Sequence, residues 1–187
     1  MSNESSIEII ERDKTDLAAA VKQSIKEHLA TLDKQGVKVY GYSLSTAEEI
    51  NEIIAPCGIA NTKPRSESTH LEQYFTPDEW SNDLGEWGNN IFAKNIPLFS
   101  KLINEFKAVH ISETPEFCYD QYELSFVSSF HQMCVQVLRD LRNEGVFNSE
   151  TFFAVWVSDP NDWDMALKSI RELNPAKILD GWYGNNA

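Results

Sequence analysis

Apolar side chains recur at helical intervals in several stretches of this chain. Between Lys14 and Asp33 they are spaced three or four residues apart, which predicts one amphipathic helix that Gly36 ends. The same spacing predicts a helix after Asn95, the longest helix over residues 116–144, and a helix that begins at Asp159-Pro160. The four apolar stripes are, in order, Leu17, Val21, Ile25, Leu29 and Leu32; Phe99, Leu102, Ile103 and Phe106; Val127, Phe130, Cys134, Val137 and Leu141; and Trp163, Leu167, Ile170 and Leu173.

Local signals mark several helix ends. Thr76 is a suitable N-cap, Pro77 fits a first turn, and Glu79 would complete a capping box with Thr76, so a further helix is predicted to start there. Arg139 and Arg142 complement the dipole of the predicted longest helix near its C-terminus, and Gly145 is suited to stop it. Gly85 and Gly88 are expected to keep the segments that follow them short.

Three short segments have the composition of strands. Residues 37–45 are rich in β-branched and aromatic residues, and residues 52–61 follow as a second strand, so the two are predicted to form a hairpin. Residues 152–157 are apolar on both faces, which is typical of a central strand covered by helices. The order of elements predicts one α+β domain over residues 14–187, with a small antiparallel sheet packed against several helices, after a loose leader over residues 1–13.

Composition and targeting signals place the chain among ordinary globular proteins. It is 42% hydrophobic, 11% aromatic and 24% charged, which excludes disordered and fibrous classes. The polar, acidic start lacks the features of a secretory signal, and no apolar run approaches the length of about 18 residues that a transmembrane helix needs. Cys57, Cys118 and Cys134 are few and odd in number, which indicates free thiols in a reducing compartment. We therefore expect a cytoplasmic protein that neither spans nor binds a membrane.

The charge is strongly negative and unevenly distributed. The 16 Lys and Arg against 29 Asp and Glu leave a formal net charge of −13, which argues against nucleic acids and anionic membranes as partners. Three windows contain acids but no Lys or Arg: residues 66–93, 108–138 and 143–167. Their acids are Glu67, Glu72, Asp78, Glu79, Asp83 and Glu86; Glu113, Glu116, Asp120 and Glu123; and Glu144, Glu150, Asp159, Asp162 and Asp164.

No catalytic or metal-binding motif is present in the sequence. His131 and Cys134 are spaced for two metal ligands on one helix face, but Cys134 belongs to an apolar stripe, so core packing is the better interpretation. Cys57 has no local partner that would make it a nucleophile. The acids at 159, 162 and 164 resemble the opening of a calcium loop but lack its glycine and its final glutamate, and a helix cap explains them better. Nothing fixes the separation of the acid pairs Asp78/Glu79 and Glu113/Glu116. No catalytic residue, metal or cofactor is predicted.

Aromatic residues set among acids are the remaining functional signal. Trp and Tyr are the preferred anchors of protein interfaces, and surrounding acids would steer a basic partner. The alternative is that these rings are core residues whose neighbours face water. The predicted partner-binding residues are Tyr74, Asp78, Glu79, Trp80, Asp83, Glu86, Trp87, Asp162 and Trp163.

Several segments resemble a known family in the order in which they occur. The most specific are Thr76-Pro77 to Trp80, Gly145, Ser158-Asp159 and Leu173-Asn174-Pro175. From about Lys14 onward the chain resembles domain-of-unknown-function family 4303, a bacterial family of intracellular domains. The resemblance implies an α+β sandwich and brings no established activity. Some families of this kind resemble immunity proteins encoded beside toxins, which makes a cytoplasmic protein that neutralises a basic toxin domain the leading hypothesis. The alternatives are a housekeeping protein, an enzyme with a pocket not visible in sequence, and an oligomeric scaffold built on the longest helix.

Overall fold

A computed structural model of the chain describes residues 6–46, 56–68, 70, 74–80, 91–110, 120–157 and 163–182. Its helices are α1 (Ser6–Lys34), α4 (Ile96–Val109), α5 (Gln121–Asn143) and α6 (Trp163–Leu173), with short 3-10 helices η1 (Arg65–Glu67) and η2 (Pro77–Glu79). The strands are β1 (Gly41–Thr46), β2 (Cys57–Asn61) and β3 (Phe152–Val157). This confirms the predicted α+β class. No described helix has the length and apolar character needed to cross a membrane.

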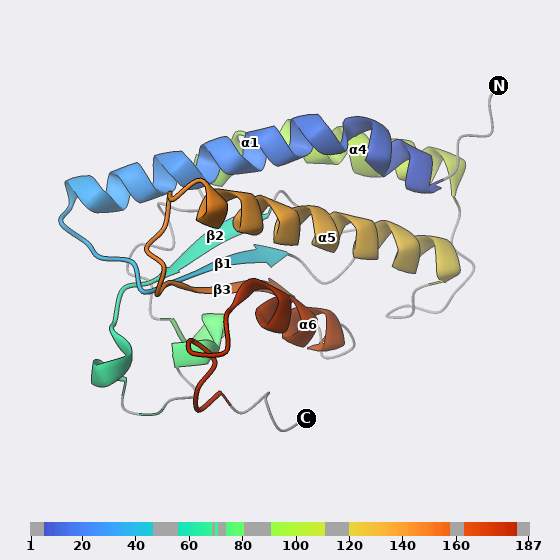
Figure 1. Ribbon diagram of the computed structural model, residues 1–187. Coiled ribbons are helices and arrows are strands. Elements are labelled where there is room, and N and C mark those ends of the chain that lie inside the picture. The colour runs from blue at the N-terminus through green and yellow to red at the C-terminus, as the bar shows by residue number, and fades with distance from the viewer. Residues whose placement is uncertain are drawn as a thin grey trace.

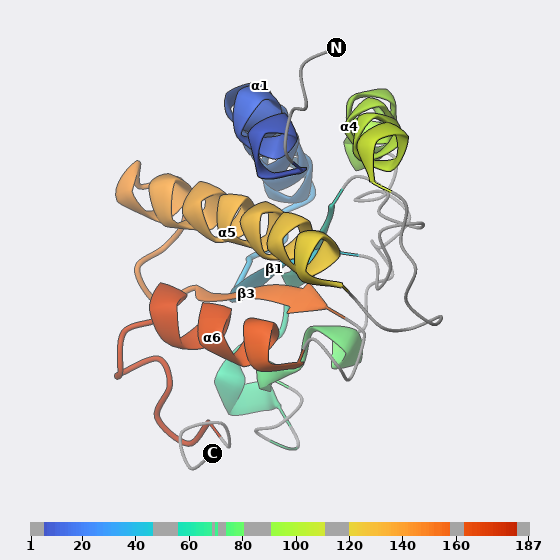
Figure 2. The same ribbon diagram turned by 90° about the vertical axis from the view of Figure 1, so that its right-hand side faces the viewer.

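The helices lie on both faces of a small sheet. Helices α1, α4 and α5 cover one face, while α6 and the segment that contains η2 cover the opposite face (Figures 1 and 2). Side chains of β3 alternate between the two sides, as a strand covered on both faces requires. Phe153 and Val155 join the core cluster under α1, α4 and α5, whereas Phe152, Ala154 and Trp156 join the cluster on the α6 side.

The strand order corrects two sequence-based predictions. The order is β2-β1-β3, so β1 is central and β3 lies at an edge of the sheet, and β3 pairs with β1 in parallel rather than antiparallel. The hairpin of β1 and β2 is antiparallel as predicted. Because β2 is antiparallel, it returns the chain to the end of the sheet at which β1 begins, and the segment that contains α4 and α5 leads from there to the start of β3. An apolar strand can lie at this edge because α6 packs along β3. Side chains of α6 and of the turn that follows α6 also form hydrogen bonds with the backbone of β3.

Two side chains satisfy the backbone at the outer edge of β3. The Asn174 amide accepts a hydrogen bond from the Phe153 N–H at 2.8 Å and donates one to the Phe153 carbonyl at 2.6 Å. The Ser169 hydroxyl lies 3.0 Å from the Val155 N–H and accepts its hydrogen bond. An edge strand otherwise presents unpaired N–H and C=O groups, so these contacts replace a neighbouring strand.

Helix boundaries differ from the sequence-based ones at two N-termini. Helix α1 begins at Ser6, inside the predicted leader, and its 29 residues make it longer than the 23-residue α5. Its early start places Ile9 and Ile10 in the core. Helix α5 begins after Asp120, whose side chain accepts from the N–H groups of Tyr122 and Glu123 in a capping box that was not predicted.

The capping box predicted at Thr76 is wrong. Thr76 makes no side-chain capping hydrogen bond, and only the short 3-10 helix η2 forms before Trp80 returns to an extended conformation. The Trp80 indole N–H donates to the Tyr74 carbonyl at 3.0 Å, and this contact holds the ring against the sheet. Burial of Trp80 therefore decides the local backbone more than the capping signal does.

Gly58 on β2 is required by the packing of two rings. A methyl group at this position would come within 2.7 Å and 2.8 Å of two Phe92 ring carbons and closer still to the Tyr42 hydroxyl oxygen. We expect Gly58→Ala to lower the free energy of unfolding by about 1–3 kcal/mol, because both rings are buried and have little room to move. Urea denaturation measures this loss. Tyr42→Phe removes the nearest atom, so the double variant should lose less than the sum of the two single losses; strict additivity would contradict the steric explanation.

Candidate functional site

The predicted aromatic anchors gather over one face of the sheet. The rings of Tyr74 and Trp80 both lie 6.1 Å from the Phe152 ring, and Trp163 lies 5.2 Å from Trp156, which is on the same face of β3. Residues 74–80 and the start of α6 therefore share the α6 face (Figure 2). The structure thus brings together parts of two acidic windows that are more than 80 residues apart in the sequence.

The members of this group differ in exposure. Tyr74 and Trp80 are only 6% and 7% exposed, so their rings are buried and pack beneath the surface. Asp78 and Glu79 are exposed, and Trp163 is 38% exposed. Asp83, Glu86, Trp87 and Asp162 lie outside the described residues. Among the described candidates, the two carboxylates of η2 and the Trp163 ring are available to a partner, and their role in binding remains a prediction.

The negative charge is concentrated outside the described framework. All 16 Lys and Arg lie in the described residues, together with 18 of the 29 Asp and Glu. The remaining 11 acids lie in segments that contain no Lys or Arg. Within the framework many acids pair with bases across helices: Lys22 with Asp140 at 2.5 Å, Lys26 with Glu144 at 2.9 Å, and Lys94 with Glu27. The described framework is thus nearly neutral, and most of the excess charge belongs to the segments outside it.

Two of these acidic connections leave the sheet at the same place. Thr46 and Val157 are paired in register as the last residues of the parallel strands β1 and β3. Residues 47–55 follow the first strand and residues 158–162 follow the second, and together they carry five acids and no base. The carboxyl ends of neighbouring parallel strands are a frequent position for binding sites, because connections meet there.

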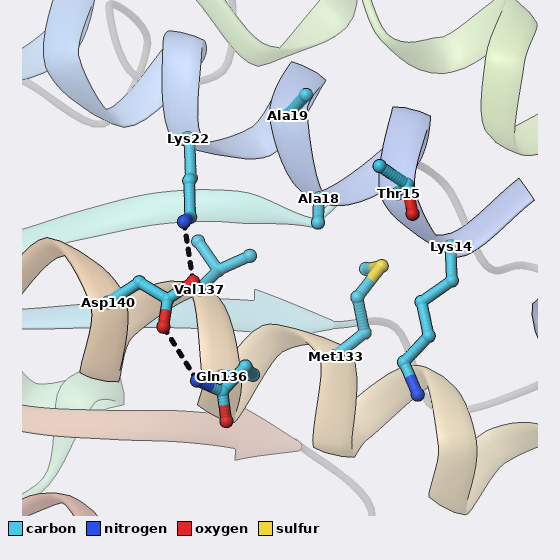
Figure 3. Close-up of a pocket in the computed structure, with 9 residues that line it drawn as sticks. All are labelled: Lys14, Thr15, Ala18, Ala19, Lys22, Met133, Gln136, Val137 and Asp140. Atoms are coloured by element: carbon cyan, nitrogen blue, oxygen red, sulfur yellow. Dashed lines mark hydrogen bonds and ion pairs between the residues drawn. The ribbon is translucent and has the colours of Figure 1, made fainter.

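A groove lies on the surface between α1 and α5 (Figure 3). It has a volume of about 350 Å³ and exists because Ala18 and Ala19 leave space opposite Met133 and Val137. The Lys22–Asp140 ion pair spans one part of it. A second hollow of about 650 Å³ lies beside residues 37–40 and 146–151. Neither lining holds a histidine or a cysteine.

The cysteines considered as nucleophiles or ligands are held as neutral thiols. Burial raises the pKa of Cys57 to about 11 and that of Cys134 to about 12. His131, the proposed metal partner of Cys134, is buried, and burial lowers its pKa to about 4. A thiolate is the form that attacks substrates or binds metals, so core packing is the supported interpretation of Cys134. Cys118 lies outside the described residues.

A buried polar contact joins α1 to the sheet. The His28 Nδ1 atom lies 2.9 Å from the Tyr42 hydroxyl oxygen, and the two side chains are almost fully buried. Burial lowers the pKa of His28 to about 4 and raises that of Tyr42 well above its usual value. Both groups are therefore neutral over the physiological pH range, which suits a structural hydrogen bond.

A cluster that sequence reasoning missed lies where α4 ends and α5 begins. His110 follows α4, and its Nε2 atom is 2.7 Å from the Asp120 Oδ2 atom. Glu123 completes a group whose potential ligand atoms all lie within 4.8 Å of one another. Burial raises the pKa of Asp120, but the N–H groups of Glu123 and Tyr122, together with His110, more than offset this and leave it below its usual value. Asp120 and Glu123 had a local capping signal in sequence, whereas nothing local pointed to His110.

Comparison with known proteins gives one match. A family model described as a domain of unknown function, DUF4303, matches residues 17–175. No curated protein and no solved structure matches the chain.

Proposed function

The chain belongs to the DUF4303 family of domains of unknown function, and from this starting point we propose that it is a binding protein that neutralises a basic toxin domain in the cytoplasm. An immunity protein of this kind works through a complementary surface and needs no chemistry of its own. The proposal concerns the α6 face, the acidic connections and the predicted residues within them: Tyr74, Asp78, Glu79, Trp80, Asp83, Glu86, Trp87, Asp162 and Trp163.

The separation of charge is the observation that supports the proposal. A framework with 18 acids and 16 bases carries segments with 11 acids and no base. Balanced charge contributes little field outside a framework, whereas an excess of acids attracts a basic surface over about 8 Å at physiological ionic strength. Such a field raises the rate at which a basic partner associates, to as much as about 10⁸–10⁹ M⁻¹s⁻¹.

The described part of the α6 face supplies an aromatic contact beside exposed acids. Trp163 is exposed, and its ring rests on the buried ring of Trp156, which holds it in place. A ring whose position is already restricted loses little conformational freedom when a partner binds it. Asp78 and Glu79 are held at the same face because Trp80 is anchored directly after them.

The test is protection of cells. Co-expression of this chain with a toxin domain encoded beside its gene should restore growth, and the two purified proteins should form a stable complex. Absence of both rescue and complex formation with every adjacent toxin domain would contradict the proposed function.

Reversing two charges should slow association without unfolding the protein. We expect Asp78→Lys combined with Glu79→Lys to lower the association rate with the basic partner by about tenfold or more at low salt, and by less at high salt. The melting temperature should change little, because both side chains are exposed. The matched control is Asp16→Lys with Asp33→Lys, which makes the same charge change on exposed positions of α1, on the other side of the sheet. If both pairs of substitutions slowed association equally, the association rate would depend on the net charge of the protein and not on the position of Asp78 and Glu79.

A further inference from the structure

The ends of α4 and α5 bring a histidine and two carboxylates together. Asp120 and Glu123 belong to the first turn of α5, and His110 comes from the residue that follows α4. The His110 and Asp120 side chains are 15% and 22% exposed, so the group is mostly shielded but reachable by a small ion. Three ligands from two elements form a set that neither element provides alone.

His110 and Asp120 form a close polar contact between the two elements. The Nε2 and Oδ2 atoms are 2.7 Å apart, and His110 contributes to lowering the pKa of Asp120. The Nε2 atom is buried, and its direction falls short of the angular requirement of a hydrogen bond. An imidazole nitrogen and a carboxylate oxygen can each offer a lone pair, so a cation bound at this contact would interact with both atoms at once.

The capping hydrogen bonds orient the two carboxylates. Asp120 uses Oδ1 to accept from the N–H groups of Tyr122 and Glu123, at 2.7 Å and 2.9 Å, which leaves Oδ2 on the side of His110. Glu123 accepts from the Asp120 N–H at 2.9 Å through Oε2. Proteins usually fix the orientation of a metal-binding side chain through hydrogen bonds from neighbouring groups to that side chain.

The local charge favours a cation despite the helix N-terminus. The N-terminus of a helix is equivalent to roughly +0.5 of an elementary charge, which on its own would repel a cation. Two ionised carboxylates contribute about four times as much charge of opposite sign. One imidazole nitrogen and two carboxylate oxygens suit a borderline ion such as zinc better than calcium or magnesium, which prefer oxygen ligands only.

We propose that His110, Asp120 and Glu123 bind one zinc ion. Ligand atoms that lie 2.0–2.2 Å from a tetrahedral zinc are roughly 3.4 Å apart, so Nε2 and Oδ2 have to separate by less than about 1 Å. Three protein ligands leave one coordination position for water or for a group of another molecule, as in zinc sites that act on or bind a ligand. The zinc site is independent of the proposed toxin binding, which needs no metal.

Titration of the metal-free protein with zinc chloride tests the site. Calorimetry of the wild-type chain should show one zinc ion bound per chain, and zinc should raise the melting temperature. The decisive variant is Asp120→Asn with Glu123→Gln. Asn is as good an N-cap as Asp, and Gln serves in a capping box as Glu does, so the helix start is kept while both charges are removed.

The double variant separates metal binding from helix capping. In the presence of a chelator its melting temperature should match that of the wild-type chain within a few degrees, whereas its affinity for zinc should fall at least about 100-fold. His110→Gln should lower the affinity as well. Zinc affinity that is unchanged in these variants would place the ion elsewhere, for example on cysteines, and would overturn the proposal. Weak binding without a 1:1 stoichiometry in the wild-type chain would overturn it too, and would leave His110 and Asp120 as an ion pair only.

Discussion

Asn174→Ala is expected to lower the free energy of unfolding by about 3–4 kcal/mol. The Asn174 side chain is 6% exposed, and its amide bonds both the N–H and the C=O of Phe153 and donates to the Ile170 carbonyl at 2.8 Å. Alanine would leave the two Phe153 groups without a partner, whereas the Ile170 carbonyl would keep the Asn174 backbone N–H at 3.2 Å. Each buried unsatisfied group costs about 1–3 kcal/mol, so two such groups account for the expected loss. Urea denaturation followed by circular dichroism measures the loss.

Asn143→Ala is the matched control. Asn143 is exposed at the end of α5, so the same chemical change there should alter stability by no more than about 0.5 kcal/mol. If Asn174→Ala proved as mild as the control, the amide would not be what satisfies the outer edge of β3.

Arg142 contacts the same backbone segments as Asn174, so the effects on stability of replacing these two residues should be coupled. Its guanidinium donates to the Leu173 and Thr151 carbonyls and lies 4.1 Å from the centre of the Phe153 ring. The end of α5, the start of β3 and the end of α6 therefore share one polar junction. Because the two side chains share neighbours, the effects of replacing both should not be additive.

Stability is expected to fall by about 3–4 kcal/mol when the pH is lowered from 7 to 5. Burial lowers the pKa of His28 and of His131 to about 4, whereas a histidine in the unfolded chain has a pKa near 6.5. Between these values the unfolded chain binds two protons that the folded chain does not, so acid favours unfolding. This contribution is fully present above about pH 6.5 and is lost as the pH falls towards 4, with each proton costing about 1.4 kcal/mol per pH unit.

Urea denaturation at a series of pH values measures this dependence. His131→Met removes one of the two titrating groups and should reduce the slope between pH 6 and 5 by about half. Asn174→Ala removes no titrating group, so its stability curve should run parallel to that of the wild-type chain at a lower level. Stability that stays constant from pH 7 to 5 would mean that the two imidazoles can be protonated inside the fold.

Most of the candidate surface was accessible to sequence reasoning, but the roles of its residues were not. The base-free windows pointed to residues 74–80 and Trp163, and the structure places these on one face of the sheet. Sequence grouped Tyr74 and Trp80 with Asp78 and Glu79, yet the rings are buried and the carboxylates are exposed. A tryptophan among acids has the same local pattern in a core and in an interface, because the pattern does not contain the partner against which the ring packs.

The amino-acid sequence by itself determined the type and approximate position of most elements of this protein, and its excess of negative charge. Periodic apolar positions and glycine stop signals act within a few residues, and the helices around Val21, Ile103, Phe130 and Ile170 and the strand at Val155 are where these signals predict them. Net charge and the absence of bases over long stretches are properties of the chain alone.

Only the tertiary structure decided strand order, the position of β3 and the meeting of His110 with Asp120. Each depends on groups that are distant in sequence. Asn174 supplies Phe153 with the hydrogen bonds that a neighbouring strand would otherwise make, and it does so from 21 residues away in the sequence. The apolar pattern of a strand is the same whether another strand or a helix lies beside its edge. The structure also decides which charges are paired: Lys22 and Asp140 form an ion pair across α1 and α5, although they are 118 residues apart in the sequence.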